Sequence, residues 1–257
     1  MMRRVEAVRR ASWFAVVLGL ALLAGRPAAA GGDLDLPIAP GLDPLDITVE
    51  ANIRPVDPEA DAIPFEEDPA VVLYDEEIPV EARSIIFVID TSGSMCEPVG
   101  YFAGLDGTPT TGTRLDRAKV ELVRAILALG ESYAFTVHAY SCTFARWSPS
   151  RRPATPENKA SAVRWVLGLQ ALGGTGTGPA LAVALADREN KTIVLLTDGA
   201  PGCGGNGDTI ADHLATIQAN NVQRASIHGF GIGATGVFEQ FLRDVAAASG
   251  GTYHPVR

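Results

Sequence analysis

Oxygen-bearing side chains stand at alternate positions directly after an apolar run in this chain. The run spans residues 84–89, and Asp90, Ser92 and Ser94 follow it. An unbroken apolar run is typical of a strand covered on both faces. A carboxylate and two hydroxyls, without His or Cys, suit a hard divalent cation, with Mg²⁺ first and Ca²⁺ or Mn²⁺ next. The spacing therefore predicts one part of a metal site at the end of a strand.

Two further loops carry matching oxygen ligands. Asp198 follows a second apolar run at 192–196, and Thr175 lies in a loop at 173–178 that is rich in glycine. In an open parallel sheet, ligands bind beyond the carboxyl ends of the strands, and glycines let a loop approach closely. We expect the metal ligands Asp90, Ser92, Ser94, Thr175 and Asp198. Because Mg²⁺ takes about six oxygens, one position stays open for an external carboxylate.

The apolar spacing from Ser84 onward alternates between the period of a strand and that of a helix. This alternation predicts an α/β fold: a Rossmann-like open, mostly parallel sheet with one antiparallel edge strand and helices on both faces. Strands are expected at 84–89, 133–140, 144–147 (the antiparallel one), 192–196, 225–232 and 252–256. Helices are expected at 115–129, 157–172, 178–186, 208–219 and 237–248.

Together, the three motifs resemble the metal-ion-dependent adhesion site (MIDAS) of the von Willebrand factor A (vWA) family. Residues 90–95 match its D-x-S-x-S pattern, residues 173–181 resemble its threonine loop, and residues 196–199 resemble its aspartate loop. The resemblance covers residues 84–256. It implies metal-dependent protein binding with direct ligation through Ser92, Ser94 and Thr175. Asp90 and Asp198 would then coordinate partly through water.

Two features depart from the family pattern. The segment between Ser94 and the first expected helix is long and rich in glycine, and it carries Tyr101 and Phe102. As an exposed loop beside the metal, it could shape a pocket for a partner or shield the site. The sequence given ends at Arg257, directly after the last expected strand. We therefore do not expect the affinity switching that integrin-type members couple to a further C-terminal helix.

The first 30 residues have the composition of an export signal. They carry a net charge of +4, an apolar run at 13–24 and a small-residue cleavage site at 28–30. This pattern predicts a signal peptide that is cut after Ala30; the alternative is an uncleaved N-terminal anchor. A span needs roughly 20 apolar residues, so this run is short for one. We expect a secreted or periplasmic protein with no membrane span in the mature chain.

Residues 31–83 are expected to form an acidic, proline-rich segment that is extended or disordered. They contain eight prolines and have a net charge of −13, a composition that buries little apolar surface. Short strands could form at 47–50 and 78–80. The segment could be a solvated linker, a tether or docking arm, or an internal acidic ligand that masks the metal site. The predicted vWA domain then spans 84–257.

The domain's charge and its cysteines narrow the possible functions. Residues 84–257 carry equal numbers of acidic and basic side chains, and they contain no basic stripe that would indicate a nucleic-acid partner.

In an exported protein, Cys96, Cys142 and Cys203 predict one disulfide and one free thiol, with three pairings possible. No C-x₂-C spacing supports zinc. His138 and His228 are expected in the core or at its rim, and His213 on a helix surface.

Three functions compete for this metal site. The first is a Mg²⁺-dependent protein-binding module, of the adhesion type, that grips a carboxylate of a partner. The second is a structural module whose ion staples loops. The third is a Mg²⁺-dependent hydrolase similar to D-x-D-x-T phosphatases, but Ser92 stands where their second carboxylate would be. The chain also lacks a phosphate-binding lysine loop and a G-x-S-x-G motif. We therefore expect a non-enzymatic binding module.

Overall fold

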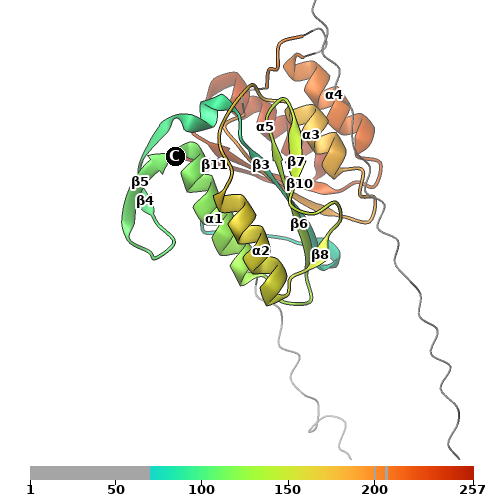
Figure 1. Cartoon of the computed structure of the whole chain (residues 1–257). Coiled ribbons are helices and arrows are strands. Elements are labelled where there is room, and N and C mark those ends of the chain that lie inside the picture. The colour runs from blue at the N-terminus through green and yellow to red at the C-terminus, as the bar shows by residue number, and fades with distance from the viewer. Residues whose placement is uncertain (1–69, 200, 206–207) are drawn as a thin grey trace, which may run out of the picture. The chain divides into compact units, whose positions relative to one another are not determined.

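A seven-stranded sheet forms the centre of the domain in the computed structural model, which describes residues 70–199, 201–205 and 208–257 (Figure 1). The expected signal peptide, residues 31–69 and the possible strand at 47–50 lie outside the described residues. The strand order is β11-β10-β9-β3-β6-β7, and β8 also pairs with β6. The strands are β3 (Ser84–Asp90), β6 (Ala134–Tyr140), β7 (Phe144–Arg146), β8 (Arg152–Pro153), β9 (Thr192–Thr197), β10 (Ser226–Ile232) and β11 (Tyr253–Val256).

The central strands are parallel, and the edge is antiparallel. β3 pairs in parallel with β6 and β9, and β10 pairs in parallel with β9 and β11. β7 and β8 run antiparallel to β6. The predicted fold class is confirmed, with two short antiparallel strands where one was expected. The carboxyl ends of β6, β3, β9 and β10 therefore lie at the same edge of the sheet.

Helices cover both faces of the sheet. Ile85 and Phe87 of β3 face a core shared with α1 and α2, whereas Ile86 and Val88 face a second core shared with α3, α4 and α5. This alternation explains why the strand reads as continuously apolar. The helices are α1 (Arg114–Ala128), α2 (Pro156–Leu167), α3 (Thr177–Ala184), α4 (Ile210–Asn220) and α5 (Gly236–Ser249).

The helix ends follow local signals. A capping box starts α1: Thr113 Oγ1 accepts the Asp116 N–H at 3.1 Å, and Asp116 Oδ2 accepts the Thr113 N–H at 2.9 Å. The predicted end of α2 at residue 172 was wrong. That helix stops at Leu167, where Gly168 forms its C-cap, and the following residues instead form the loop that leads to Thr175.

The folded domain begins before the expected boundary at Ser84. Residues Val71–Leu73 (β1) and Glu76–Ile78 (β2) form an antiparallel hairpin, followed by a 3₁₀ turn at Glu81–Arg83. The side chains of Val71, Leu73 and Ile78 are buried in the core on the α1 side. Of the possible strand at 78–80, only Ile78 lies in a strand, as the last residue of β2. β1 was not predicted, because its three residues stand among acidic side chains.

The long segment after Ser94 is a hairpin rather than an irregular loop. β4 (Pro98–Ala103) pairs antiparallel with β5 (Pro109–Thr113). Arg124, well inside α1, donates to the carbonyl of Ala103 at 3.0 Å and also to that of Gly104. The hairpin therefore extends along α1 (Figure 1), with Tyr101 82% exposed. The segment is therefore a hairpin where a loop was expected, and its tip contacts α1 through Arg124.

Candidate metal site at the carboxyl edge of the sheet

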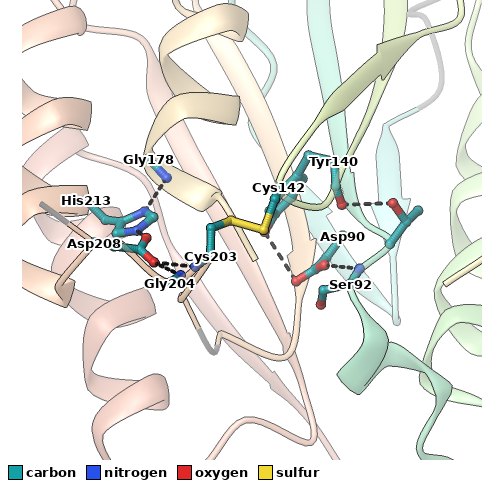
Figure 2. The surroundings of a disulfide bond; sticks show 10 residues. Asp90, Ser92, Tyr140, Cys142, Gly178, Cys203, Gly204, Asp208 and His213 are labelled. Atoms are coloured by element: carbon teal, nitrogen blue, oxygen red, sulfur yellow. Dashed lines mark hydrogen bonds and ion pairs between the residues drawn. A yellow bond between two sulfur atoms is a disulfide. The ribbon is translucent and has the colours of Figure 1, made fainter. Parts of the chain in front are cut away.

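Asp90 is the buried centre of the site. As the last residue of β3, it is 0% exposed. Its Oδ1 accepts the Ser92 N–H at 2.7 Å, and its Oδ2 accepts the Thr197 hydroxyl at 2.5 Å and the Tyr140 hydroxyl at 3.4 Å. The ends of β3, β6 and β9 therefore meet at one carboxylate. Figure 2 shows Asp90 beside Ser92, close to the Cys142–Cys203 disulfide.

Ser92 and Ser94 turn back towards each other after the strand. A short 3₁₀ turn, Gly93–Cys96, brings the Ser92 and Ser94 hydroxyl oxygens to 3.1 Å. Between them, the Gly93 N–H donates to the Gly173 carbonyl at 2.8 Å. A Cβ on residue 93 would lie 3.2 Å from that carbonyl oxygen, so glycine permits the close approach. This contact joins the serine loop to the loop that carries Thr175.

Thr175 is held by backbone contacts on both sides. Its N–H donates to the Gly202 carbonyl at 3.0 Å, and the Gly202 N–H donates back at 2.8 Å. The next residue, Gly176, donates to the Ser141 carbonyl at 2.9 Å. Thr175 is 4% exposed. The threonine loop therefore lies between the loop after β6 and the loop after β9.

One disulfide and one thiol lie at this edge. Cys142 and Cys203 are bonded to each other, and Cys96, exposed at the end of the serine turn, is the free cysteine among the three, all of which the structure describes. The predicted count of one disulfide and one free thiol is confirmed. The sequence left the pairing open, and the structure assigns it.

Asp198 offers an oxygen without a partner. Its Oδ2 accepts from Arg114 Nη1 at 2.9 Å, and the same guanidinium donates to the Ser94 carbonyl at 3.3 Å. Its Oδ1 is buried and has no hydrogen-bond partner within the described part of the chain. A buried polar atom without a partner costs about 1–3 kcal/mol, so this oxygen is a place where a ligand would be stabilising.

The electrostatics of the site also favour a cation. Burial raises the pKa of Asp90 to about 6, although hydrogen bonds from Thr197 and Ser92 oppose this rise, and the charge of Asp198 adds to it. Of the two carboxylates, that of Asp198 pairs with the Arg114 guanidinium, whereas that of Asp90 accepts hydrogen bonds from neutral groups. A positive ion would stabilise the charged form of Asp90 and satisfy the open Asp198 oxygen. The oxygen ligands fit a hard cation, and the described residues contain no group of three or more His, Cys, Asp or Glu side chains suited to a metal.

Three residues around the site were not predicted from the sequence. Tyr140 pairs in register with Asp90, so its place at the end of the neighbouring strand could have indicated it. Thr197 precedes the predicted ligand Asp198 and could have been found in the same way. No sequence pattern indicated Arg114, because its contact with Asp198 joins residues that are far apart in the sequence.

The expectation for His213 was wrong. Its side chain is buried rather than on a helix surface, and its Nδ1 accepts the Gly178 N–H at 2.7 Å. Its Nε2 lies 2.9 Å from Asp208 Oδ1. Because α4 packs against α3, His213 is covered, although the sequence pattern placed it on the polar face of its helix. His213 therefore anchors the start of α3, directly after the threonine loop.

Known proteins share this fold and sequence pattern. Residues 110–255 match the family model of the von Willebrand factor type A domain. The chain belongs to this family. It is 31% identical over 193 residues to inter alpha-trypsin inhibitor, heavy chain 4, of Mus musculus, and 30% identical over 186 residues to inter-alpha-trypsin inhibitor heavy chain H4 of Homo sapiens. These matches cover 68% and 66% of this chain but 18% of each relative.

Solved structures agree with the family assignment. A von Willebrand factor type A structure from Catenulispora acidiphila is 25% identical, with a TM-score of 0.51, and the match covers 68% of this chain and 38% of that one. The PilB minor pilin from Streptococcus sanguinis is 16% identical, with a TM-score of 0.50, over 69% of this chain and 58% of that one. The second match speaks for the fold alone.

Proposed function

We propose that this protein is a metal-dependent protein-binding module, and that Asp90, Ser92, Ser94, Thr175 and Asp198 hold Mg²⁺, or Mn²⁺ or Ca²⁺ in its place. The observation that carries the proposal is the buried Asp198 Oδ1 without a partner, in a cluster whose other oxygens come from three loops at one sheet edge. Membership of the vWA family supports it, because domains of this family are protein-interaction modules.

The charge balance of the site favours gripping a carboxylate. Arg114 pairs with Asp198 Oδ2, so the two acidic side chains supply about one unit of net negative charge. Three of the five ligands are neutral hydroxyls. A bound divalent ion would keep excess positive charge and an open position, which an acidic side chain of a partner protein would fill. No nucleic-acid partner is implied.

Catalysis is not part of the proposal. The hydrolases that resemble this strand end use a second carboxylate two residues after the first, and here that position is Ser92. The serine hydroxyl at this position, 3.1 Å from the Ser94 hydroxyl, does not supply the proton-donating carboxyl group that those hydrolases use. We infer a non-enzymatic module.

We also propose that the protein is exported, with residues 1–30 removed after Ala30. The charge and apolar pattern of those residues supports export, as does a disulfide at an exposed edge. No helix in the described residues is long and apolar enough to cross a membrane.

Peptide selection tests the binding function. Peptides would be selected from a display library on the purified protein in Mg²⁺, and each selected peptide would be compared with a version in which its Glu or Asp is replaced by the amide. Binding should disappear with EDTA, with the amide peptide and with Ser92→Ala. Ser150→Ala, which changes an exposed serine outside the candidate site, is the matched control and should bind normally.

Two further measurements, thermal unfolding and a phosphatase assay, separate the alternatives. If Mg²⁺ raises the melting temperature but no selected peptide depends on it, the ion is a structural staple and the binding function is wrong. If the protein hydrolyses a phosphate ester in Mg²⁺, and Asp90→Asn abolishes this turnover, the non-enzymatic proposal is wrong.

A further inference from the structure

The disulfide lies directly against the loop that carries Thr175. It joins Cys142, two residues after β6, to Cys203, in the loop after β9, with Cα atoms 5.5 Å apart (Figure 2). It therefore links the two segments that flank the threonine loop. In sequence these half-cystines are 61 residues apart, and the Gly-rich loop lies between them.

Thr175 and Gly176 each form backbone hydrogen bonds with the residue before one half-cystine. Thr175 exchanges two hydrogen bonds with Gly202, the residue before Cys203. Gly176 donates to Ser141, the residue before Cys142. The loop is therefore a bridge between two segments whose separation the disulfide fixes.

The glycines of the loop fit the disulfide closely. A Cβ on residue 174 would lie 2.8 Å from Cys142 Sγ and 2.5 Å from the Gly202 carbonyl oxygen. A Cβ on residue 176 would lie 3.0 Å from the Ser141 carbonyl oxygen and 3.5 Å from Cys203 Sγ. Position 174 therefore needs glycine, and position 176 leaves little room for a larger residue, because the disulfide and the adjoining backbone pack against the loop on either side of Thr175.

A second anchor holds the Cys203 segment and the far end of the loop. Asp208 accepts the N–H groups of Cys203 and Gly204, and His213 joins Asp208 to the Gly178 N–H (Figure 2). The hydrogen bond from His213 lowers the pKa of Asp208, so this carboxylate is charged at neutral pH. This anchor holds the α3 end of the loop through contacts that do not include the disulfide bond itself.

Both half-cystines are exposed to solvent. The disulfide therefore lies at the protein surface, where a small dithiol or a reducing protein can approach it. Exposed disulfides belong to the labile group in redox exchange, in contrast to buried structural ones. The bond stands among loops rather than within a core cluster, so the two hydrophobic cores do not depend on it.

We propose that the Cys142–Cys203 disulfide is a redox-sensitive clamp that holds Thr175 in position and thereby sets the cation affinity of the site. The inference rests on the proposed function and adds a means of regulation to it. Reduction consumes one dithiol: two electrons and two protons pass to the protein, the Cys142–Cys203 bond breaks, and the dithiol closes to its own disulfide. The Gly202 and Ser141 contacts then no longer hold the threonine loop in place.

Amide hydrogen exchange without metal tests the clamp itself. A Cys96→Ser background removes the free thiol, and the oxidised and TCEP-reduced proteins are compared. Reduction should speed exchange at the Thr175 and Gly202 amides by about tenfold or more. Amides of the core strands, such as those of Val88 and Val194, should not change. Unchanged exchange at Thr175, or an equal increase in the core strands, would overturn the clamp.

Calorimetric titration with Mg²⁺ tests its consequence. The reduced protein should bind Mg²⁺ about tenfold more weakly, within the usual range of coupling between two sites, and reoxidation should restore the affinity. A Cys142→Ser/Cys203→Ser protein should match the reduced one. Equal affinity in both redox states would overturn the inference while leaving the metal site intact. If the oxidised protein binds no Mg²⁺, the proposed function fails and the inference fails with it, whatever the exchange data show.

Discussion

The two ends of strand β3 carry polar clusters of opposite kinds. At the first end, Ser84 Oγ donates to Asn190 Oδ1 at 2.8 Å and accepts from Arg151 Nη1 at 2.7 Å. Arg151 also forms a two-point ion pair with Asp187. At the other end, Asp90 and Ser92 lie near Asp198, whose Oδ1 has no partner among the described residues.

The two clusters differ in whether their polar atoms already have hydrogen-bond partners. Polar atoms of Ser84, Asn190, Arg151 and Asp187 bond to one another, so that cluster stabilises the fold. The Asp90 end keeps hydroxyls and one carboxylate oxygen available, at a cost in stability that an ion would offset. We therefore expect the Ser84 cluster to contribute stability and the Asp90 cluster to contribute binding, and mutations should separate these roles.

The largest expected effect concerns the hairpin that leads into the first end of β3. A protein that starts at residue 79 lacks Val71, Leu73 and Ile78, whose side chains are buried. Burial of one such side chain contributes about 1.5–3 kcal/mol, so the free energy of unfolding should fall by at least about 4 kcal/mol. A protein that starts at residue 69 is the matched control and should unfold like the full chain. Equal stability of both in urea would mean that the hairpin does not belong to the folded domain.

Within the Ser84 cluster, Asn190→Ala should cost about 3 kcal/mol. Asn190 is 0% exposed, accepts from Ser84 and donates to the Thr192 carbonyl at 2.8 Å. The substitution leaves buried polar atoms without partners, which is one of the strongly destabilising changes. Urea unfolding measures the loss, and Mg²⁺ affinity should stay unchanged. A change in Mg²⁺ affinity would break the division between the two ends.

At the Asp90 end, Ser92→Ala should show the reverse pattern. The wild-type protein should gain about 2.7 kcal/mol when Mg²⁺ is present at about 100 times its dissociation constant. The variant should lose this gain while changing metal-free stability by less than about 1 kcal/mol. Thermal unfolding with and without Mg²⁺ measures both quantities. A large metal-free loss would place Ser92 among the structural residues.

His228 carries another buried atom without a partner among the described residues, in a strand rather than in the loops of the candidate site. Its Nε2 has no partner in the described chain, although His228 lies within β10 and not among the loops. Burial lowers its pKa to about 4, with a further contribution from His254. Between this value and 6.5 the unfolded chain binds a proton that the folded chain does not, so stability is full above about pH 6.5 and falls as the pH drops towards 4.

The expected loss for His228 is about 2 kcal/mol between pH 7 and pH 5. Urea unfolding of wild type and His228→Gln across this range measures it, and the variant should have the flatter profile. His138, whose pKa burial also lowers to about 4, contributes equally to both proteins. An identical slope in wild type and variant would rule out His228 as a source of the pH dependence.

Much of the site's surroundings could be predicted from the sequence because its signals are local. The apolar run before Asp90 gave the strand, and parallel strands must open their loops at one edge. Asp90, Ser92, Thr175 and Asp198 were therefore expected together, and they do lie on adjoining loops at that edge. Whether they bind a metal stays a prediction.

Features that depend on distant contacts escaped prediction. The partner of Arg114 across the fold, the pairing of Cys142 and the burial of His213 each depend on how loops and helices pack, which no periodicity encodes. The β4–β5 hairpin was missed because its glycines and threonines lack the apolar alternation of a half-buried strand. It lies against α1 with much of its surface exposed, so its sequence shows no core face.

The structure also changes how an internal acidic ligand should be tested. Deletion of residues 33–77 would be one test of the hypothesis that residues 31–83 mask the metal site. Such a deletion would remove the buried Val71 and Leu73 and would confuse unmasking with unfolding. A deletion that stops at residue 69 preserves the hairpin. It should raise affinity for an acidic peptide if the acidic segment masks the site, and leave affinity unchanged if it does not.

The most direct test of the central claim is anomalous diffraction from crystals soaked in Mn²⁺. We predict one strong manganese peak among the side chains of Ser92, Ser94 and Thr175, next to Asp90 and Asp198. Ser92→Ala crystals treated in the same way should show no peak there. A saturating soak of the wild-type protein that places manganese elsewhere, or leaves this position empty, would contradict the account.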